Sequence, residues 1–501
     1  MSLTKLASVL LMSVLAAPLL AAERADIGLS TGGTVIERVR VGGPAPPSLP
    51  TLMLIGGLNG PGESTARVEK AIAAFAKRKR PPFRLLAVPL ANPEARPLQF
   101  PPSGVAYREN IESNVLWRWI GVQAPDLVLI AGDEDHGLAQ ALSSNVVAEV
   151  GRMPARVVPA DHDLLDVKPA ALAPSEAHRE MDRRRARTAR QLAEELAKHY
   201  GHDFDQPWYI QAIALIGQAR LGHVDEVQRL AEPYVDGTRD SLARANSLVL
   251  AGHMIFTELA RRTGDARYVQ MVRKVADLGF EQDGSMKESV PYHDQYSDSV
   301  FMGTVMPAQA GGLTGERKYF DLAARHIAFM QKIVLRSDGL YRHQPLTDAA
   351  WARGNAFPAM GLALALSEFP HDHPAFPKLL ADFQSHMRVL AKWQTSDGLW
   401  RNVVDYPGAY PELSATAMIG WAMLRGVRSG WLPAAEYQPH IDKAWQAVLE
   451  RIGPDGHVVD GCESTLKMKS VEEYLHRAAI LGPDPRTGAM ALLFATERMT
   501  E

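Results

Sequence analysis

TGDARY at residues 263–268 and its echo TGERKY at residues 314–319 both connect amphipathic stretches. The dipeptide Asp-Gly also recurs, at intervals of 55, 59 and 58 residues, at 283–284, 338–339, 397–398 and 455–456. A repeat of this period indicates a stacked supersecondary unit, and here each unit holds two helices. We therefore expect the larger part of the chain to be a series of helical hairpins.

Apolar residues with helical spacing continue from residue 176 almost to the end of the chain. Helices are expected at 176–199, 207–221, 239–263, 266–279, 299–313, 318–335, 355–368, 375–393, 412–425 and 434–452. About 320 residues at this period give five to six hairpins. A ring of hairpins closed on itself, an (α/α)6 barrel, has a cavity at one rim, and an open solenoid is the structural alternative. The closed ring is favoured because the Asp-Gly turns would share one rim, where the following loops are rich in aromatic residues and His.

The N-terminal part of the chain has a different pattern. Short apolar runs at 51–55, 84–88 and 127–130 end at Gly or Pro and are typical of buried strands, and residues 64–77 between the first two have the spacing of an amphipathic helix. This order predicts a small α/β domain with a largely parallel sheet. The fold class is therefore multidomain, α/β plus all-α, with divisions at 1–22, 23–170 and 171–501.

The composition excludes several classes of protein. The 501 residues are 46% hydrophobic and 22% charged, which is typical of chains that bury a large core and excludes disorder. The 54 Lys and Arg residues nearly balance the 57 Asp and Glu residues, so no basic surface for binding nucleic acid is expected. Cys462 is the only cysteine, which excludes an intrachain disulfide and a multi-thiolate metal site.

The first residues have the layout of a secretory signal. Lys5 precedes an apolar run at 6–20, and Ala21-Ala22-Glu23 supplies small residues before a cut. We expect cleavage after Ala22 and a periplasmic or secreted protein. The run is shorter than the roughly 20 residues that span a bilayer, so no membrane association is expected after cleavage. A buried N-terminal helix is the alternative.

Five segments that follow repeat turns or begin helices carry the candidate chemistry. They are YHDQYSDSVFM at 292–302, DGLYRH at 338–343, WARGNAF at 351–357, DGLW at 397–400 and ELSATA at 412–417. In a closed ring these segments can converge on one mouth. An Asp, an Arg, a His and several aromatic rings suit a sugar that carries a carboxylate, because rings stack on apolar sugar faces and Arg pairs with the anion.

These segments resemble the unsaturated glucuronyl and rhamnogalacturonyl hydrolases over about residues 176–500. The matched pattern is aromatic-x-Asp-x-x-Phe-Met, Gly-Leu-Tyr-x-His, Trp-Ala-Arg-Gly-Asn and Glu-x-Ser-Ala-Thr-Ala, in that order. The resemblance implies an (α/α)6 barrel that uses no metal or other cofactor. It also implies removal of a terminal 4,5-unsaturated uronic acid from oligosaccharides made by polysaccharide lyases, through hydration of the C4=C5 bond.

The resemblance assigns roles to individual residues. Asp298 matches the acid that protonates C4 and helps to deliver water to C5, and Asn246 stands near the position of the family's second Asp. The predicted substrate-binding residues are Tyr296 for stacking, His343 for the sugar, Arg353 for the carboxylate, Trp351 and Phe357 as a flanking platform, and His293 and Trp400. For His293 plain loop packing is an equal alternative, and for the Trp and Phe residues core packing is the alternative.

The N-terminal domain resembles the zinc carboxypeptidase fold more weakly, through Gly56 to Gly60 and 91–93, 107–110 and 125–129. In that fold a His-x-x-Glu follows the first Gly turn, but Asn59 takes the His position here and Glu63 is one residue out of register. Because catalytic zinc needs three protein ligands, we expect the zinc site to be lost. Two other functions stay open: a zinc peptidase or amidase based on Glu63 and His136, and a catalytically inactive sugar-binding protein.

Overall fold

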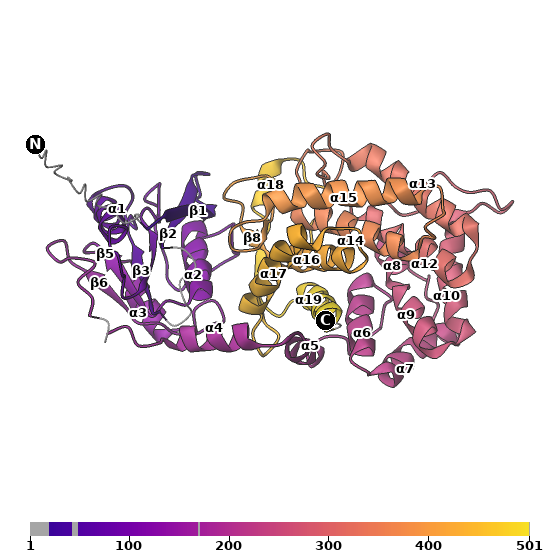
Figure 1. Cartoon of the computed structure of the whole chain (residues 1–501), viewed down its shortest axis with the longest axis horizontal. Coiled ribbons are helices and arrows are strands. Elements are labelled where there is room, and N and C mark those ends of the chain that lie inside the picture. The colour runs from indigo at the N-terminus through magenta and orange to yellow at the C-terminus, as the bar shows by residue number, and fades with distance from the viewer. Residues whose placement is uncertain (1–19, 43–48, 169–170, 500–501) are drawn as a thin grey trace, which may run out of the picture.

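The computed structural model describes residues 20–42, 49–168 and 171–499, which form a sheet-containing part and a larger helical part (Figure 1). The expected signal at 1–22 falls almost entirely outside the described residues, and Ala22 begins the first strand. The expected domain boundary at 170 also falls on residues that are not described. Within the described residues, no helix has the length and apolar character needed to cross a bilayer.

The sheet has six strands in the order β1-β2-β4-β3-β5-β6. They are β1 (Ala22–Leu29), β2 (Val35–Val41), β3 (Thr51–Ile55), β4 (Arg84–Val88), β5 (Leu127–Ala131) and β6 (Ala155–Val158). Strands β4, β3, β5 and β6 are parallel, which confirms the predicted strands at 51–55, 84–88 and 127–130. Strands β1 and β2 add antiparallel pairs at one edge.

Helices cover both faces of this sheet, and the alternation of side chains along each strand explains the two cores. On one face, Leu52 and Leu54 pack with α1 (Glu63–Phe75). On the other face, Met53 and Ile55 pack with α2 (Ile111–Gln123) and α3 (Leu138–Ser144). A parallel sheet buried on both faces needs strands that are apolar throughout, as β3 is.

The helical part begins with α4 (Glu176–Ala186). Its inner helices are α6 (Tyr209–Arg220), α8 (Ser247–Gly252) with α9 (Met254–Thr263), α11 (Ser299–Met302) with α12 (Val305–Thr314), α14 (Ala352–Glu368), α16 (Leu413–Arg428) and α19 (Pro485–Arg498). Its outer helices are α5 (Ala189–Ala197), α7 (Val224–Val235), α10 (Ala266–Ala276), α13 (Arg317–Val334), α15 (Phe376–Trp393) and α17 (Ala434–Arg451). The short elements are η2 (Asp277–Gly279), α18 (Val471–Leu475), β7 (Trp400–Arg401), β8 (Pro411–Glu412), β9 (Val458–Cys462) and β10 (Ala479–Gly482).

The inner helices contact one another in a closed circuit. Helix α6 packs on α8 and α9, these pack on α11 and α12, and the circuit continues through α14, α16 and α19 back to α6. Burial explains the two layers, because α14 is buried around almost its whole circumference whereas α13 buries one face. In Figure 1 the last helix, α19, accordingly lies beside α6 although some 265 residues separate them in sequence.

Several predicted helices differ in detail from the observed ones. The stretch 176–199 is two helices because Thr188 forms a capping box with Gln191 and starts a new helix. The stretch 239–263 becomes helical only at Ser247 and breaks at His253. The stretch 299–313 is also two helices, and α7 and α19 were not predicted.

Charged and aromatic contacts join the two parts of the chain. Arg118 on α2 pairs with Asp460 on β9 at 3.0 Å, and Arg401 on β7 pairs with Asp26 on β1 at 2.5 Å. The rings of Tyr107 and Tyr410 stack with centroids 4.3 Å apart. Because these contacts are buried or half-buried, the α/β part is packed firmly against the rim of the helical part that bears β7 to β10.

Candidate active site

Asp298 lies at the start of α11, where its side chain is not used as a helix cap. The carboxyl oxygen Oδ1 is buried and has no hydrogen-bond partner among the described residues, although 24% of the whole side chain is exposed. A buried carboxyl oxygen without a partner is costly in a folded protein, which makes the position a candidate for function. An Asp at a helix start commonly caps the helix through its side chain, and Asp298 does not do so here.

Burial raises the pKa of Asp298 to about 7, and the charges of Arg353 and Arg486 oppose that rise. The ordinary value is 3.8, so desolvation outweighs the two arginines. Near neutral pH this carboxyl can hold a proton and release it. A general acid needs a pKa near the working pH, and Asp298 has one.

His343 faces the same carboxyl. Its Nε2 is 3.6 Å from Asp298 Oδ1, beyond hydrogen-bond distance, and its Nδ1 is 2.8 Å from the Tyr474 hydroxyl. Tyr474 accepts a hydrogen bond from Gln344, so its own O–H is free to donate to Nδ1. In the tautomer that accepts this bond at Nδ1, the imidazole proton lies on Nε2, on the side of Asp298. Burial lowers the pKa of His343 to about 3, so the ring is neutral.

The backbone fixes this pair. The Ser297 N–H donates to the His343 carbonyl oxygen at 2.9 Å, which ties the loop before α11 to the segment 338–343. Gly354 in the WARGNA motif allows α14 to approach both Ser297 and His343 closely. A Cβ at this position would lie 2.8 Å from Ser297 Oγ and 3.2 Å from His343 Cδ2. The glycine is therefore needed for close packing behind the site.

Tyr296 supplies the accessible ring of the site. It is half-buried and tilted against His343, with ring centroids 4.8 Å apart, and the ammonium group of Lys467 lies 5.4 Å from its centroid. The stacking role of Tyr296 stays a prediction, for which an accessible ring is required. Lys467 was not predicted, and it adds a positive charge over the same ring.

Arg353 is close to the site but is 2% exposed. Its Nη1 donates to Ser414 Oγ and to the Cys462 carbonyl, and its Nη2 donates to the Glu463 carbonyl, at 2.9 to 3.0 Å. These bonds hold the chain after β9 against α14 and α16. The predicted clamp on a substrate carboxylate would have to use the guanidinium donors that remain.

The other predicted aromatic residues pack behind the site. Trp351 is 2% exposed and lies between the Arg353 guanidinium, 4.5 Å from its ring, and the ring of His343, at 4.6 Å. Phe357 is 1% exposed and packs on Phe301 and Tyr209. Trp351 packs against polar groups and Phe357 against other rings, and neither forms an open platform, because almost none of their surface is accessible.

The prediction that Trp400 binds substrate is wrong. It is fully buried in the core of the helical part, and its indole N–H donates to the Leu390 carbonyl on α15 at 2.8 Å. A side chain with no accessible surface cannot contact a substrate in this structure. Core packing, the alternative given for Trp400, describes its place.

Asn246 and His293 have mainly local contacts. Asn246 caps α8, accepting from the Val249 N–H and donating to the Arg244 carbonyl. Helix α8 contacts α11, so Asn246 begins the helix next to the one that Asp298 begins. His293 is half-buried against Phe329 and accepts from the Gln295 N–H, which fits loop packing.

The loop before Asp298 is conformationally unusual. Tyr292, Asp294 and Gln295 all have positive φ, at 65°, 46° and 58°. Such values are rare for residues other than glycine and cluster at functional sites. The loop therefore presents the YHDQYSD segment in a shape that a relaxed chain does not favour.

Sequence reasoning missed the segment 463–477, which we call the closing segment. It contributes Lys467 above Tyr296 and Tyr474 on His343, and Ser464 on it accepts from Arg486 at 2.8 Å. No repeat or helical period marks these residues. Their one local signal is the polar, turn-rich composition of 463–470.

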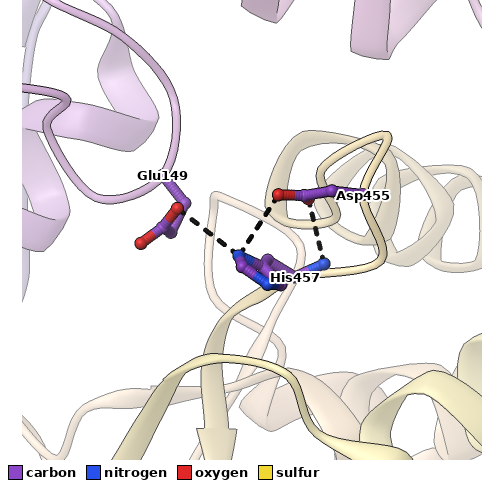
Figure 2. A group of neighbouring side chains, drawn as sticks. All are labelled: Glu149, Asp455 and His457. Atoms are coloured by element: carbon purple, nitrogen blue, oxygen red, sulfur yellow. Dashed lines mark hydrogen bonds and ion pairs between the residues drawn. The ribbon is translucent and has the colours of Figure 1, made fainter. Parts of the chain in front are cut away.

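The N-terminal candidates do not form a metal centre in the described residues. His136 Nε2 is 2.6 Å from Asn59 Oδ1, and Glu63 belongs to no group of three potential ligands. One such group is found elsewhere, at Glu149, Asp455 and His457, and Figure 2 shows it between the two parts of the chain. His457 Nδ1 is 3.5 Å from Glu149 and 3.2 Å from Asp455, and the half-buried imidazole with these two exposed carboxylates makes a contact between the two parts of the chain.

The fold is a closed circuit of inner helices, and the buried carboxyl of Asp298 lies at the start of one of them. Residues 220–501, more than half of the chain, match the model of Glycosyl Hydrolase Family 88. The protein belongs to this family. The family is one of hydrolases, and the region of this chain that matches it contains Asp298, His343 and Arg353.

Curated relatives agree with this family. The chain is 24% identical over 245 residues to the unsaturated rhamnogalacturonyl hydrolase YesR of Bacillus subtilis, covering 45% of this chain and 69% of that protein. It is 34% identical over 113 residues to an unsaturated 3S-rhamnoglycuronyl hydrolase of Formosa agariphila, covering 22% of this chain and 29% of that protein. The chain thus spans about two thirds of the first relative and under a third of the second.

Solved structures support the fold of the helical part. A possible member of family GH105 from Klebsiella pneumoniae aligns with a TM-score of 0.53 at 19% identity, over 62% of this chain and 93% of that one. A family 105 glycoside hydrolase from C. acetobutylicum gives 0.52 at 20% identity, over 62% and 99%. The shared region is the size of the helical part, so the α/β part is additional to those structures.

Proposed function

We propose that this protein removes a terminal 4,5-unsaturated uronic acid from oligosaccharides produced by polysaccharide lyases. Asp298 carries the proposal, because it is a buried carboxyl with a pKa near neutrality and an unpartnered oxygen beside a neutral imidazole. The family match and the names of the relatives support the substrate class. The helical part would then be a six-hairpin (α/α)6 barrel with its substrate at the rim that bears Asp298.

In the proposed reaction, protonated Asp298 gives its proton to C4 and the double bond becomes a cation at C5, shared with the ring oxygen. Water adds at C5 and returns a proton to the Asp298 carboxylate. The resulting hemiketal opens the ring, and the hemiacetal left at C1 releases the aglycone. His343 Nε2–H and the charges of Arg353 and Arg486 stabilise the carboxylate between the two proton transfers.

One carboxyl is enough for this sequence of steps, because the same group donates and recovers the proton. Asn246 would act only by capping α8, since both ends of its amide already bond to backbone. Tyr296 would stack on the sugar and Lys467 would attract its negative charge. We propose no metal or cofactor in the reaction.

The proposal extends to the rest of the chain. The N-terminal residues would direct export to the periplasm or the medium, and the α/β part would be a carboxypeptidase-like domain that has lost its zinc ligands. The pairing of His136 with Asn59 favours that loss over a peptidase or amidase. A catalytically inactive sugar-binding protein is the second candidate, because no carboxylate stands at Asn246.

A panel of lyase-generated unsaturated disaccharides tests the proposal. Hydration destroys the conjugated chromophore, so a hydrolase lowers its ultraviolet absorbance and releases the aglycone sugar. Binding without loss of absorbance for every member of the panel would instead support the sugar-binding protein.

A further inference from the structure

A small cavity lies between the α/β part and the helical part, away from Asp298. It has a volume of about 60 Å³ and is lined on one side by α2 and β1 and on the other by residues 395–401, Arg451 and Asp460. This volume holds roughly four water molecules or one small oxyanion. The cavity is therefore large enough for a ligand of phosphate size and too small for a sugar.

Every carboxylate of the cavity wall already has an arginine partner. Asp26 pairs with Arg401 at 2.5 Å and Asp460 with Arg118 at 3.0 Å. Asp397 pairs with both Arg38 and Arg40, at 2.9 and 3.1 Å, and these two arginines also contact Glu23. The acidic side chains of the wall are thus neutralised by cations of the protein.

Arg451, in contrast, is a buried cation without a hydrogen-bonded partner. It is 4% exposed, and neither Nε nor Nη1 forms a hydrogen bond to any described residue. The nearest carboxylate oxygens, Asp460 Oδ2 and Glu450 Oε2, are 3.8 and 3.9 Å away, and the other oxygen of each carboxylate pairs with a second arginine. Burying a charge in this way is strongly unfavourable unless something pairs with it.

Two further donors of the same wall are unpartnered, Nε of Arg118 and the indole N–H of Trp119. Among the fully buried side-chain atoms of the described lining residues, every atom without a hydrogen-bond partner is a donor. Guanidinium groups bind oxyanions through paired N–H donors. We propose that this interdomain cavity is a binding site for a small oxyanion, which would hold the two parts of the chain together.

Titration of the full-length protein with inorganic phosphate tests the proposal without any substrate, by calorimetry and by melting temperature. We expect saturable binding and a rise in melting temperature that follows the occupancy of the site. Arg451→Gln should weaken binding at least about tenfold, because a charge-assisted bond is lost. Trp119→Phe, which keeps the ring and removes the N–H, should weaken it less.

Arg152→Gln serves as the matched control, because Arg152 is an exposed arginine that pairs with Glu176. This variant should bind phosphate as the wild type does. A phosphate effect equal to that of sodium chloride at the same ionic strength would overturn the proposal. So would equal binding by the wild type and Arg451→Gln, or a crystal structure grown in phosphate with only water in the cavity.

Discussion

Asp298 Oδ1 and His343 Nε2 face each other across 3.6 Å, and a single backbone bond from Ser297 to the His343 carbonyl holds their two loops together. The acid is thus placed beside a neutral N–H donor before any substrate is present. An N–H donor in this position stabilises the Asp298 carboxylate that forms after proton transfer. The neutral His343 does not itself accept the proton.

The pH profile of kcat/KM should have an alkaline limb near pH 7. Asp298 must be protonated to act as the acid, and its pKa of about 7 means that the active form declines as the pH rises through that value. His343, with a pKa of about 3, stays neutral throughout and cannot produce the limb. Initial rates measured between about pH 5 and 9 decide this, and a flat profile would exclude Asp298 as the acid.

Asp298→Asn should stabilise the protein at alkaline pH. Because the folded-state pKa of Asp298 is raised above the ordinary 3.8, the folded protein binds an extra proton between the two values and loses stability as the pH rises from about 4 to about 7. The full shift corresponds to at most about 4 kcal/mol, and partial exposure of the side chain reduces it. Asn carries no charge, so the difference in melting temperature between variant and wild type should be larger at pH 8 than at pH 5. The same difference at both pH values would mean that the carboxyl is not desolvated.

Variants of Arg353 distinguish a role in binding the substrate carboxylate from a role in stabilising the fold. Its hydrogen bonds to Ser414, Cys462 and Glu463 predict that Arg353→Lys lowers the melting temperature, because a lysine cannot reproduce a planar fork. If Arg353 also clamps the substrate carboxylate, KM should rise roughly tenfold or more for the free acid and much less for its methyl ester. Equal losses for acid and ester would leave Arg353 with the scaffolding role alone.

Arg108 tests whether the α/β part shapes the active site. Its Nη2 donates to Glu463 at 2.8 Å and its Nε donates to the His476 carbonyl at 2.9 Å, so this residue grips both ends of the closing segment. Arg108→Ala should lower kcat/KM about tenfold or less with little change in melting temperature, because an exposed ion pair stabilises the fold weakly. Hydrogen exchange should become faster in residues 463–477. Arg152→Ala is the control, and unchanged kcat/KM with unchanged exchange would contradict the role.

The parts of the fold that were predictable from the sequence are those with a clear local period. Apolar runs such as 51–55 identified the parallel strands, and one-sided apolar spacing identified outer helices such as α13. Strand β2, VIERVRV, was missed because charged residues interrupt its apolar positions, and Arg38 is buried through partners on β1 and in the helical part. The break between α11 and α12 falls at Gly303 and Thr304, and Pro307 follows in the first turn of α12, so the sequence held a signal that the prediction of one helix overlooked.

The residues of the candidate site also fall into two groups, those that a local motif marks and those that only long-range contacts bring to the site. Asp298, His343 and Arg353 stand in motifs, so the sequence identified them, and the fold brings them together. Trp400 was misassigned because an aromatic after an Asp-Gly turn looks the same in sequence whether it faces solvent or the core. Tyr474 and Lys467 depend on contacts with residues more than 100 positions away, which no local pattern encodes.

The most direct test of the proposed chemistry compares wild type with Asp298→Asn on lyase-generated unsaturated disaccharides, at a pH below 7. The wild type should remove the absorbance of the C4=C5 bond, and the variant should do so about 10² to 10⁴-fold more slowly while it remains folded and still binds the sugar. A variant that turns over at a rate close to that of the wild type would contradict the assignment of Asp298 as the acid, and wild-type binding without loss of absorbance would contradict the hydrolase itself.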